Sequence, residues 1–260
     1  ASEFDITDAL VDGSNRIAAQ VFTWSGGSWL EAQDFYRFSG IFRDVVVTHR
    51  PAVHVADLHV RTVIDGTSAE VIVAADVDGD GRLTAQLEGV GALTRAEDGT
   101  LRARIEDARL WSPEDPRLYD LLLHLRSSAG EVVEVIRQRV GVRRFAIEGG
   151  VLRLNGVRVV FFGVNRHEFG LQGRVMTREQ TAADLRLLKS IGVNAIRTSH
   201  YPNNSFFYDL ADEFGFLVID EMNLETHGIW DAVRAGDLPV SEALPGDRAE
   251  WRDALLDRAT

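Results

Sequence analysis

The spacing of hydrophobic residues changes once along this chain, close to Val142. Before that point, apolar and polar residues alternate in short segments, a pattern typical of strands with one buried face. After it, continuous apolar runs alternate with segments of helical spacing, which is typical of a parallel sheet covered by helices. One layer architecture cannot satisfy both patterns. We therefore expect a multidomain chain, with β domains followed by an α/β domain.

Residues 51–142 predict a complete β-sandwich. Apolar and polar residues alternate with period two in segments 58–64, 69–75, 82–88, 100–105, 118–125 and 132–140. Six or seven short strands at this spacing are typical of an immunoglobulin-like sandwich. Residues 1–50 have the same β character, with strands expected at 16–22 and 41–48. These strands are too few to close a sandwich by themselves.

The segment that follows residue 143 predicts strands and helices in alternation. The expected order is strand 159–164, helix 177–191, strand 194–198, helix 204–214, strand 216–220 and helix 247–258. Thr177 and Gln180 have the spacing of a capping box, which marks the first helix start. Apolar strands that alternate with helices predict a parallel sheet.

Composition limits the partners of the protein. The chain has 40 Asp and Glu against 28 Lys and Arg, a formal charge of −12. Such a charge repels phosphate backbones and anionic lipids, so we expect neither nucleic acid nor a membrane surface as a partner. No apolar run approaches the roughly 18 to 20 residues that span a bilayer. The chain has no cysteine, which fits a reducing compartment, and we expect a cytoplasmic location.

Polar and ionisable residues gather where the three expected α/β strands end. They are Asn165, Arg166, His167 and Glu168 after the first strand, Arg197 and His200 after the second, and Asp220, Glu221, Glu225 and His227 after the third. In a barrel, active sites are built at the carboxyl ends of the strands. A single His or Arg at a strand end is more often a scaffold group, but three successive strand ends favour a functional site.

Four motifs resemble those of one enzyme family, in the family's own order. They are SGIFRDV at 39–45, LWSPEDPRLY at 110–119, GVNRHE at 163–168 and NAIRTSHYP at 194–202. Over nearly its whole length the chain resembles the retaining β-glycosidases of glycoside hydrolase family 2. The Glu225-Thr226-His227 sequence is similar to the large bacterial-type β-galactosidases within that family.

The resemblance implies three domains. Residues 1–50 would be the C-terminal part of a jelly-roll sugar-binding domain, and residues 51–142 an immunoglobulin-like β-sandwich. Residues 143–260 would be the first three βα units of a (β/α)8 TIM barrel. The opening strands of the first domain and the remaining barrel units would then lie outside this sequence. We therefore expect the chain to be an internal fragment.

The resemblance also assigns roles in sugar binding. Asp34 matches an aspartate that binds a sugar hydroxyl. His167 and His200 match histidines that contact the sugar and stabilise the transition state, where hydrogen bonds strengthen as oxocarbenium character develops. Arg197 matches an arginine held against the nucleophile.

Two metal ions are implied in the same way. Glu225 and His227 match the ligands of a magnesium ion, and oxygen with one imidazole is reasonable for a hard ion that stays partly hydrated. Asp34 matches a ligand of a sodium ion. The alternative for Glu225 and His227 is a loop glutamate and histidine in solvent.

The bond-breaking carboxylates are expected elsewhere. Retaining glycosidases use an acid/base and a nucleophile about 5 Å apart. In the family these follow the fourth and seventh barrel strands, beyond Thr260, so we do not pair Glu221 with Glu225. The complete protein is expected to be a retaining β-galactosidase that cleaves terminal β-D-galactose from β-galactosides such as lactose. It would be a homo-oligomer, for example a tetramer, and this chain alone is expected to be inactive.

Two other interpretations stay open. The complete protein could be a β-glucuronidase or β-mannosidase relative, which would share most of these motifs. Alternatively, the chain could be a non-catalytic carbohydrate-binding or complementing module, which would bind galactose without turnover.

Overall fold

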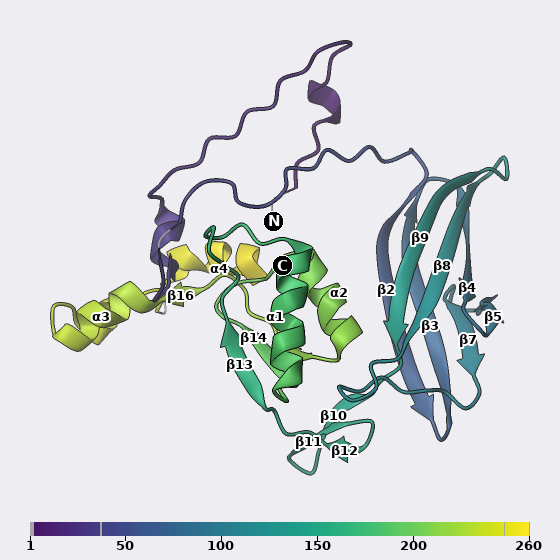
Figure 1. Ribbon diagram of the computed structural model, residues 1–260. Helices are drawn as coiled ribbons and strands as arrows, with labels where there is room; N and C mark the ends of the chain where they lie inside the picture. The colour runs from purple at the N-terminus through teal and green to yellow at the C-terminus, as the bar shows by residue number, and fades with distance from the viewer. Residues whose placement is uncertain (1–2, 37, 247, 260) are drawn as a thin grey trace. The chain divides into compact units, whose positions relative to one another are not determined.

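The computed structural model describes residues 3–36, 38–246 and 248–259. The chain forms two compact units, residues 1–44 with 225–260 and residues 45–224. Figure 1 gives the order of the elements along the chain. Among the described residues, no helix is long and apolar enough to cross a membrane.

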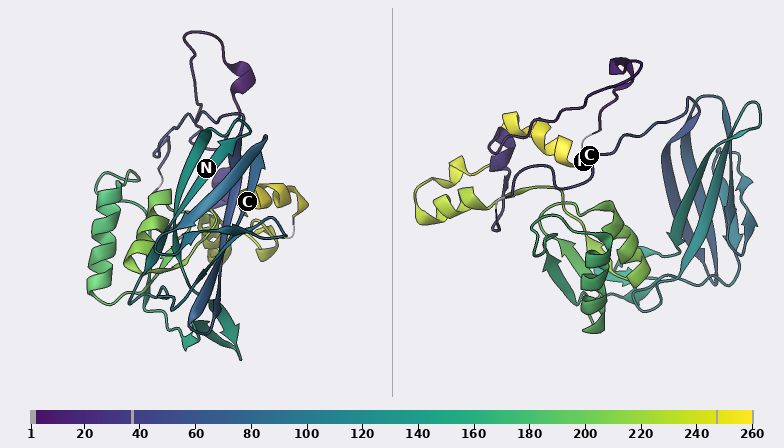
Figure 2. Two further views of the ribbon diagram at one scale, coloured as in Figure 1. Left: turned by 90° about the vertical axis from the view of Figure 1, so that its right-hand side faces the viewer. Right: turned by 45° about the horizontal axis from the view of Figure 1, so that its top comes forward.

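A β-sandwich forms the first part of the unit of residues 45–224 (Figure 1, Figure 2). Its two antiparallel sheets have the strand orders β2-β3-β7-β6 and β5-β4-β8-β9. The strands are β2 (His54–Asp65), β3 (Ser68–Asp78), β4 (Gly81–Leu87), β5 (Gly91–Ala92), β6 (Thr94–Arg95), β7 (Leu101–Ile105), β8 (Leu118–Ser127) and β9 (Val132–Gly141). The six strands expected from sequence are confirmed. The two-residue strands β5 and β6 are additional, because such short segments carry no periodic signal.

In the sandwich, the apolar residues of each alternating segment are buried and the polar residues between them are more exposed. Along β8, Leu121, Leu123 and Leu125 are at most 1% exposed, and they face a core that also contains Val71 and Val73 of β3. Each such side chain contributes roughly 1.5–3 kcal/mol on full burial. The sandwich therefore has its own hydrophobic core.

A small antiparallel sheet links the sandwich to the α/β part. It contains β10 (Phe145–Glu148), β11 (Val151–Leu154) and β12 (Val157–Arg158). Asn155 and Gly156 form the turn between β11 and β12 with φ of 53° and 82°, the left-handed pair that an Asn-Gly turn favours. β11 and β12 therefore form an antiparallel hairpin.

The α/β part is a parallel sheet of order β13-β14-β15. Its strands are β13 (Gly163–Arg166), β14 (Ala195–Thr198) and β15 (Leu217–Ile219), and its helices are α1 (Arg178–Ser190) and α2 (Ser205–Phe214). Leu185, Ile196 and Phe207, at most 1% exposed, join α1, β14 and α2 in one core. The capping box is confirmed, since Thr177 Oγ1 accepts from the Gln180 N–H at 3.2 Å and Gln180 Oε1 accepts from the Thr177 N–H at 2.9 Å.

The first parallel strand begins later than the sequence predicts, at Gly163 instead of residue 159. The Asn194 side chain occupies the hydrogen-bonding groups of the preceding residues. Its Nδ2 donates to Val160 O at 2.9 Å, and its Oδ1 accepts from the Phe162 N–H at 2.9 Å. The Asn194 side chain thus takes the place of a ladder partner at Val160 O and the Phe162 N–H, while its backbone N–H donates to Phe162 O at 3.0 Å.

The unit of residues 1–44 and 225–260 contains little regular structure. It has β1 (Glu31–Ala32), β16 (Glu225–Thr226), α3 (His227–Ala235) and α4 (Arg252–Ala259), with 3-10 segments η1 (Thr7–Ala9), η2 (Gly26–Trp29), η3 (Val240–Glu242) and η4 (Ala249–Trp251). β1 and β16 pair in parallel. Helix α3 was not predicted. The third expected helix is present as η4 and α4, and position 247 lies outside the described residues.

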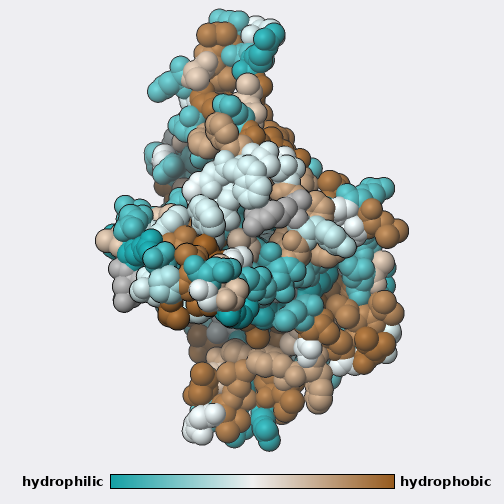
Figure 3. All heavy atoms as spheres, turned by 90° about the vertical axis from the view of Figure 1, so that its left-hand side faces the viewer, coloured by the Kyte–Doolittle hydropathy of each residue, from teal (hydrophilic) through white to brown (hydrophobic). Residues whose placement is uncertain are grey.

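The strands expected at 16–22 and 41–48 are wrong, because none of these residues lies in a strand. Strands need partners, and these segments have none among the described residues. Their hydrophobic side chains stay exposed, as for Ile17 and Phe22, which are 61% and 66% exposed. Exposed hydrophobic side chains are also visible on the face drawn in Figure 3. No jelly-roll sheet therefore forms within the described part of residues 1–50.

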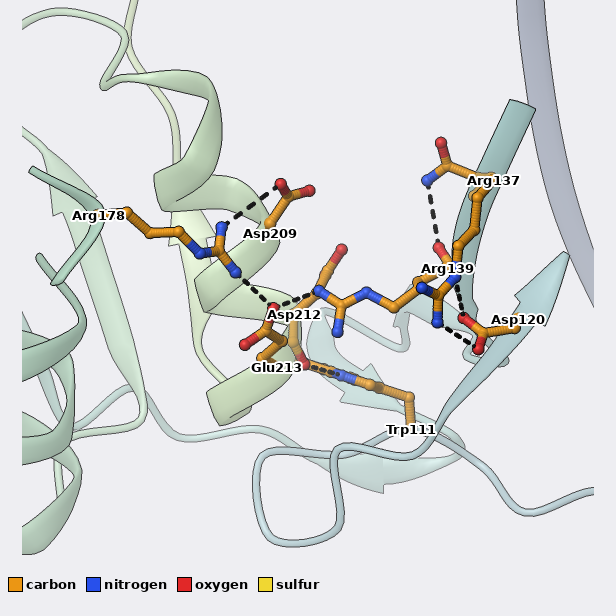
Figure 4. A network of polar contacts seen from close by, with 9 residues as sticks. Trp111, Asp120, Arg137, Arg139, Arg178, Asp209, Asp212 and Glu213 are labelled. Carbon is orange, nitrogen blue, oxygen red and sulfur yellow. Dashed lines mark hydrogen bonds and ion pairs between the residues drawn. The ribbon is translucent and has the colours of Figure 1, made fainter. Parts of the chain in front are cut away.

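The sandwich is fastened to α2 by hydrogen bonds and ion pairs within residues 45–224 (Figure 4). Trp111 Nε1 donates to Asp212 O at 2.9 Å. Arg139 of β9 pairs with Glu213, and Arg178 Nη2 reaches the same carboxylate at 2.7 Å. A strand of the sandwich and the start of α1 are therefore held by one glutamate of α2.

The end of α2 makes a second connection to the sandwich. Gly215 has φ of +74°, and a Cβ there would lie 2.5 Å from Pro113 O. Lys189 Nζ donates to Pro113 O at 2.6 Å and to Gly215 O at 3.0 Å, and burial lowers the pKa of this lysine. A glycine is required here both for its left-handed conformation and for the close approach of the two backbones.

Asp212 should make stability depend on pH. Burial raises its pKa above 3.8, Asp209 adds to this, and Arg143 and Arg139 oppose it. The folded state therefore holds this proton more tightly than the unfolded chain, and stability falls as pH rises from 3.8 through the raised pKa. We expect Asp212→Asn to increase the urea midpoint at pH 7 and to change it little below pH 3.8.

Asp80→Asn in the exposed β3–β4 turn is the control, and we expect little change at either pH. Equal effects of Asp212→Asn at both pH values would contradict the burial argument.

Candidate functional site

Parallel pairing brings the predicted strand ends together within residues 45–224. Arg166 of β13 lies opposite Thr198 of β14, and Arg197 lies opposite Ile219 of β15. The residues that follow each strand, including His167, therefore lie at one edge of the sheet. The predicted parallel sheet is confirmed by the strand order β13-β14-β15.

Arg197, Glu221 and His200 form a chain of contacts at this edge. Arg197 Nε donates to Glu221 Oε1, and His200 Nδ1 lies 2.8 Å from Glu221 Oε2. Arg197 Nη2 is also 3.3 Å from His200 Nδ1. The glutamate and histidine side chains are 22% and 16% exposed. Glu221, which the sequence left without a role, is thus the carboxylate that Arg197 contacts in this structure.

Thr198 and Asp220 support the backbone at Glu221. Thr198 is fully buried, and its hydroxyl donates to Asp220 Oδ1 at 2.8 Å while it accepts from the Glu221 N–H at 3.0 Å. The Tyr208 hydroxyl donates to the same Asp220 oxygen at 2.8 Å. Glu221 is therefore anchored to the neighbouring strand and, through Asp220, to helix α2.

The loops after β13 and β14 are tied by buried polar groups. Glu168 is 1% exposed, and its Oε1 accepts from the Asn204 N–H at 2.8 Å. The Glu168 N–H donates to the Tyr201 hydroxyl at 2.7 Å, and burial raises the pKa of this tyrosine. The rings of His167 and His200 lie edge to face, 5.9 Å apart. A negative charge at the start of α2 also complements the helix dipole.

Arg166 adds a further connection below the same loops. It is 7% exposed, donates to Asn203 Oδ1 at 3.0 Å and pairs with Asp184 of α1 at 3.0 Å. A buried arginine needs such partners, because an uncompensated charge would cost several kcal/mol, of order 3–5. Arg166 therefore has a structural role in this arrangement.

Asp34, Glu225 and His227 belong to the other unit. Glu225 opens β16, and His227 opens α3 directly after it, while Asp34 follows β1, the partner of β16. Glu225 Oε1 is 3.3 Å from His227 Nδ1, and carboxylate oxygens of Asp34 and Glu225 lie within 4.8 Å of each other. His227 Nε2 is 3.5 Å from Asp231 Oδ2. Strand pairing thus brings the three predicted residues together.

A pocket of about 330 Å³ lies away from the strand ends, between β9 and helices α1 and α2. It is lined by Arg137, Gln138, Arg139, Arg178, Asp209, Asp212 and Glu213. The arginines already contact carboxylates, as Figure 4 shows. The polar lining of this pocket therefore belongs to the ion pairs that join the sandwich to α2.

Parallel βα units with charged residues after the strands are the arrangement in which barrel enzymes build active sites. Residues 1–51 match the sugar binding domain of glycosyl hydrolases family 2, and residues 145–260 match the TIM barrel domain of the same family. Residues 53–143 match a third model described as glycosyl hydrolases family 2. The chain belongs to glycoside hydrolase family 2.

Similar curated proteins are named β-galactosidases. The one from Halalkalibacterium halodurans is 44% identical over 99% of this chain, and the one from Streptococcus thermophilus is 43% identical over 99%. The chain spans 27% and 26% of the length of these two relatives.

Similar solved structures are β-glucuronidases. The enzyme from Ruminococcus gnavus aligns with a TM-score of 0.59 and 31% identity over 66% of this chain and 30% of its own. That from Dictyoglomus thermophilum aligns with a TM-score of 0.61 and 27% identity over 75% of this chain and 33% of its own.

The role of Thr198 can be measured against a second buried threonine. Thr198→Val removes a donor to Asp220 and an acceptor for the Glu221 N–H, so we expect a loss of about 1–3 kcal/mol in unfolding free energy. Thr181 is also fully buried, but its hydroxyl has no hydrogen-bond partner among the described residues.

Thr181→Val should therefore be neutral or slightly stabilising. Urea unfolding of both variants gives the comparison, and equal losses would show that the Thr198 hydrogen bonds are not the cause.

Proposed function

We propose that the protein containing this chain is a retaining β-galactosidase, which hydrolyses terminal non-reducing β-D-galactose from β-galactosides such as lactose. The observation that carries this proposal is similarity over 99% of the chain to proteins named β-galactosidase, at 44% and 42% identity. The strand-end residues supply a polar surface suited to a sugar.

His200, His167 and Arg197 are proposed to act on the sugar and on the charge that develops during its cleavage. An imidazole can donate a hydrogen bond to a sugar hydroxyl or accept one from it. These hydrogen bonds strengthen as the sugar ring becomes electron-deficient. Asp34 is proposed to bind a sugar hydroxyl as well. The arginine supplies a fixed positive charge, which favours an ionised carboxylate nearby.

Neither catalytic carboxylate is assigned to this chain. Glu221 contacts Arg197 and His200 through its two oxygens, and the family resemblance places the acid/base and the nucleophile after later barrel strands. Glu168 is buried and bonded to the start of α2. We therefore propose that the acid/base and the nucleophile come from other parts of the protein, and that residues 1–260 alone give no turnover.

A magnesium ion is proposed at Glu225 and His227, and a sodium ion at Asp34. The donor set fits, because the neighbouring Glu225 and His227 side chains offer one carboxylate and one imidazole, and a second carboxylate lies within 4.8 Å of Glu225. When bound, a divalent ion would supply positive charge beside the reacting groups.

The assembly and location are also proposals. We propose a homo-oligomer, for example a tetramer, in the cytoplasm. The absence of cysteine from the chain and the family resemblance support these two statements.

A β-glucuronidase is the second candidate, because the similar solved structures carry that name at 31% identity. Purified full-length protein should be compared on aryl β-galactoside and aryl β-glucuronide, with kcat/KM measured for each. We expect the galactoside to be preferred by at least about 100-fold, a difference of roughly 2.7 kcal/mol. A preference for the glucuronide would overturn the proposal. Galactose binding by calorimetry without turnover would instead identify a carbohydrate-binding protein.

The metal proposal has its own test in the full-length enzyme. Glu225→Gln removes the carboxylate charge, so the magnesium concentration for half-maximal activity should rise by about 10- to 100-fold. Glu242→Gln, at an exposed position of η3, is the control and should leave the magnesium response unchanged. The magnesium assignment fails if both variants respond to magnesium as the unmodified enzyme does.

A further inference from the structure

Asp220 joins two parts of the main chain through two hydroxyl groups. The Thr198 hydroxyl and the Tyr208 hydroxyl both donate to Asp220 Oδ1, each at 2.8 Å. The Thr198 hydroxyl accepts from the Glu221 N–H at 3.0 Å. The Tyr208 hydroxyl accepts from the Asn203 N–H at 3.1 Å. One carboxylate oxygen therefore connects the residue after β15 with the loop after β14.

The partners of each hydroxyl fix the direction of these hydrogen bonds. A main-chain N–H can only donate, so each hydroxyl accepts from its N–H and donates its single proton to Asp220. A carboxylate oxygen has two lone pairs and can accept from both hydroxyls. Asp220 is exposed, but the Thr198 hydroxyl is fully buried, and a buried hydroxyl without a partner is costly. The burial of Thr198 therefore favours an intact connection.

Both ends of this connection carry residues of the candidate site. Glu221 Oε1 accepts from Arg197 Nε, so the position of the Glu221 main chain affects the position of the guanidinium. Asn203 belongs to the loop of residues 199–204, which also contains His200. Asp220 thus lies between two groups that are proposed to act on the sugar.

We infer that Asp220 is a positioning residue, which acts through the Thr198 and Tyr208 hydroxyls to hold Arg197 and the loop of residues 199–204 in one arrangement for sugar cleavage. The inference rests on the proposed function, since it concerns groups that are proposed to act on the sugar. Groups that are already in place need no rearrangement as charge develops in the transition state. A loss of this arrangement should therefore lower kcat more than it changes KM.

Two substitutions of Asp220 separate the accepted hydrogen bonds from the rest of the side chain. Asp220→Ala removes the acceptor of both hydroxyls, and the resulting misplacement should lower kcat by about 10- to 100-fold. We expect KM to stay within about 3-fold of its original value. Asp220→Asn keeps a carbonyl oxygen that can accept from both hydroxyls, so kcat should recover to within about 3-fold of the unmodified enzyme.

Tyr208→Phe interrupts the connection on the side of the loop alone. We expect kcat to fall by about 3- to 10-fold. In the double variant with Asp220→Ala, the loss should be smaller than the product of the two single losses, because both changes interrupt the same connection.

Asp98→Ala is the matched control. Asp98 Oδ1 also accepts from a threonine hydroxyl, that of Thr100 at 2.6 Å, but it lies in the β-sandwich. We expect this variant to leave kcat and KM unchanged.

Two measurements on the full-length enzyme test the inference. Steady-state kinetics on an aryl β-galactoside and an aryl β-glucuronide give kcat and KM for each variant. Crystal structures of the same variants give a readout that does not depend on turnover. We expect the Arg197 guanidinium and the Glu221 carboxylate to be displaced in Asp220→Ala and to keep their places in Asp220→Asn.

The outcomes separate the inference from the proposed function. Equal impairment of Asp220→Asn and Asp220→Ala, or losses that multiply in the double variant, overturns the inference. If Asp220→Ala does not fold, an unchanged kcat in Tyr208→Phe overturns it, and the expected fall supports it. If the glucuronide is preferred, the proposed function fails, and the same variants are judged on the glucuronide.

The crystal structures decide if neither substrate is cleaved. An undisplaced Arg197 in Asp220→Ala then overturns the inference. A displaced Arg197 that returns to its place in Asp220→Asn means that the proposed function fails while the positioning by Asp220 stands.

Discussion

Parallel pairing of β14 with both of its neighbours is the constraint on which the candidate site depends. The register places Arg166 opposite Thr198 and Arg197 opposite Ile219, so that three strands end side by side. Residues separated by more than fifty positions, such as His167 and Glu221, are then gathered at one sheet edge. A shift of register by one residue would turn each side chain to the other face of the sheet.

The same edge contains several buried polar groups. Glu168, Thr198 and Arg166 are at most 7% exposed, and each makes hydrogen bonds to a neighbouring loop or strand. Such groups are costly when unpaired, so the loops cannot move independently without losing several bonds. The sheet edge is therefore a rigid frame, which suits a site that must hold side chains at fixed orientations.

Much of the fold could be predicted from the sequence, because in those segments the hydrophobic pattern and the capping residues agree with the tertiary packing. The period-two strands of the sandwich and the Thr177–Gln180 capping box are examples. The start of β13 could not be predicted, since it depends on the Asn194 side chain binding the residues before Gly163. The strands expected at 16–22 and 41–48 failed because strand propensity does not supply a partner.

At the candidate site, too, the sequence indicated the types of residue present but not which of them contact each other. The sequence showed polar residues at three strand ends, but it did not indicate that Glu221 would contact both Arg197 and His200. That contact depends on three-dimensional proximity between two strand ends. It also gives Glu221 a place in the site, because its two oxygens hold the Arg197 guanidinium and the His200 ring at the same sheet edge.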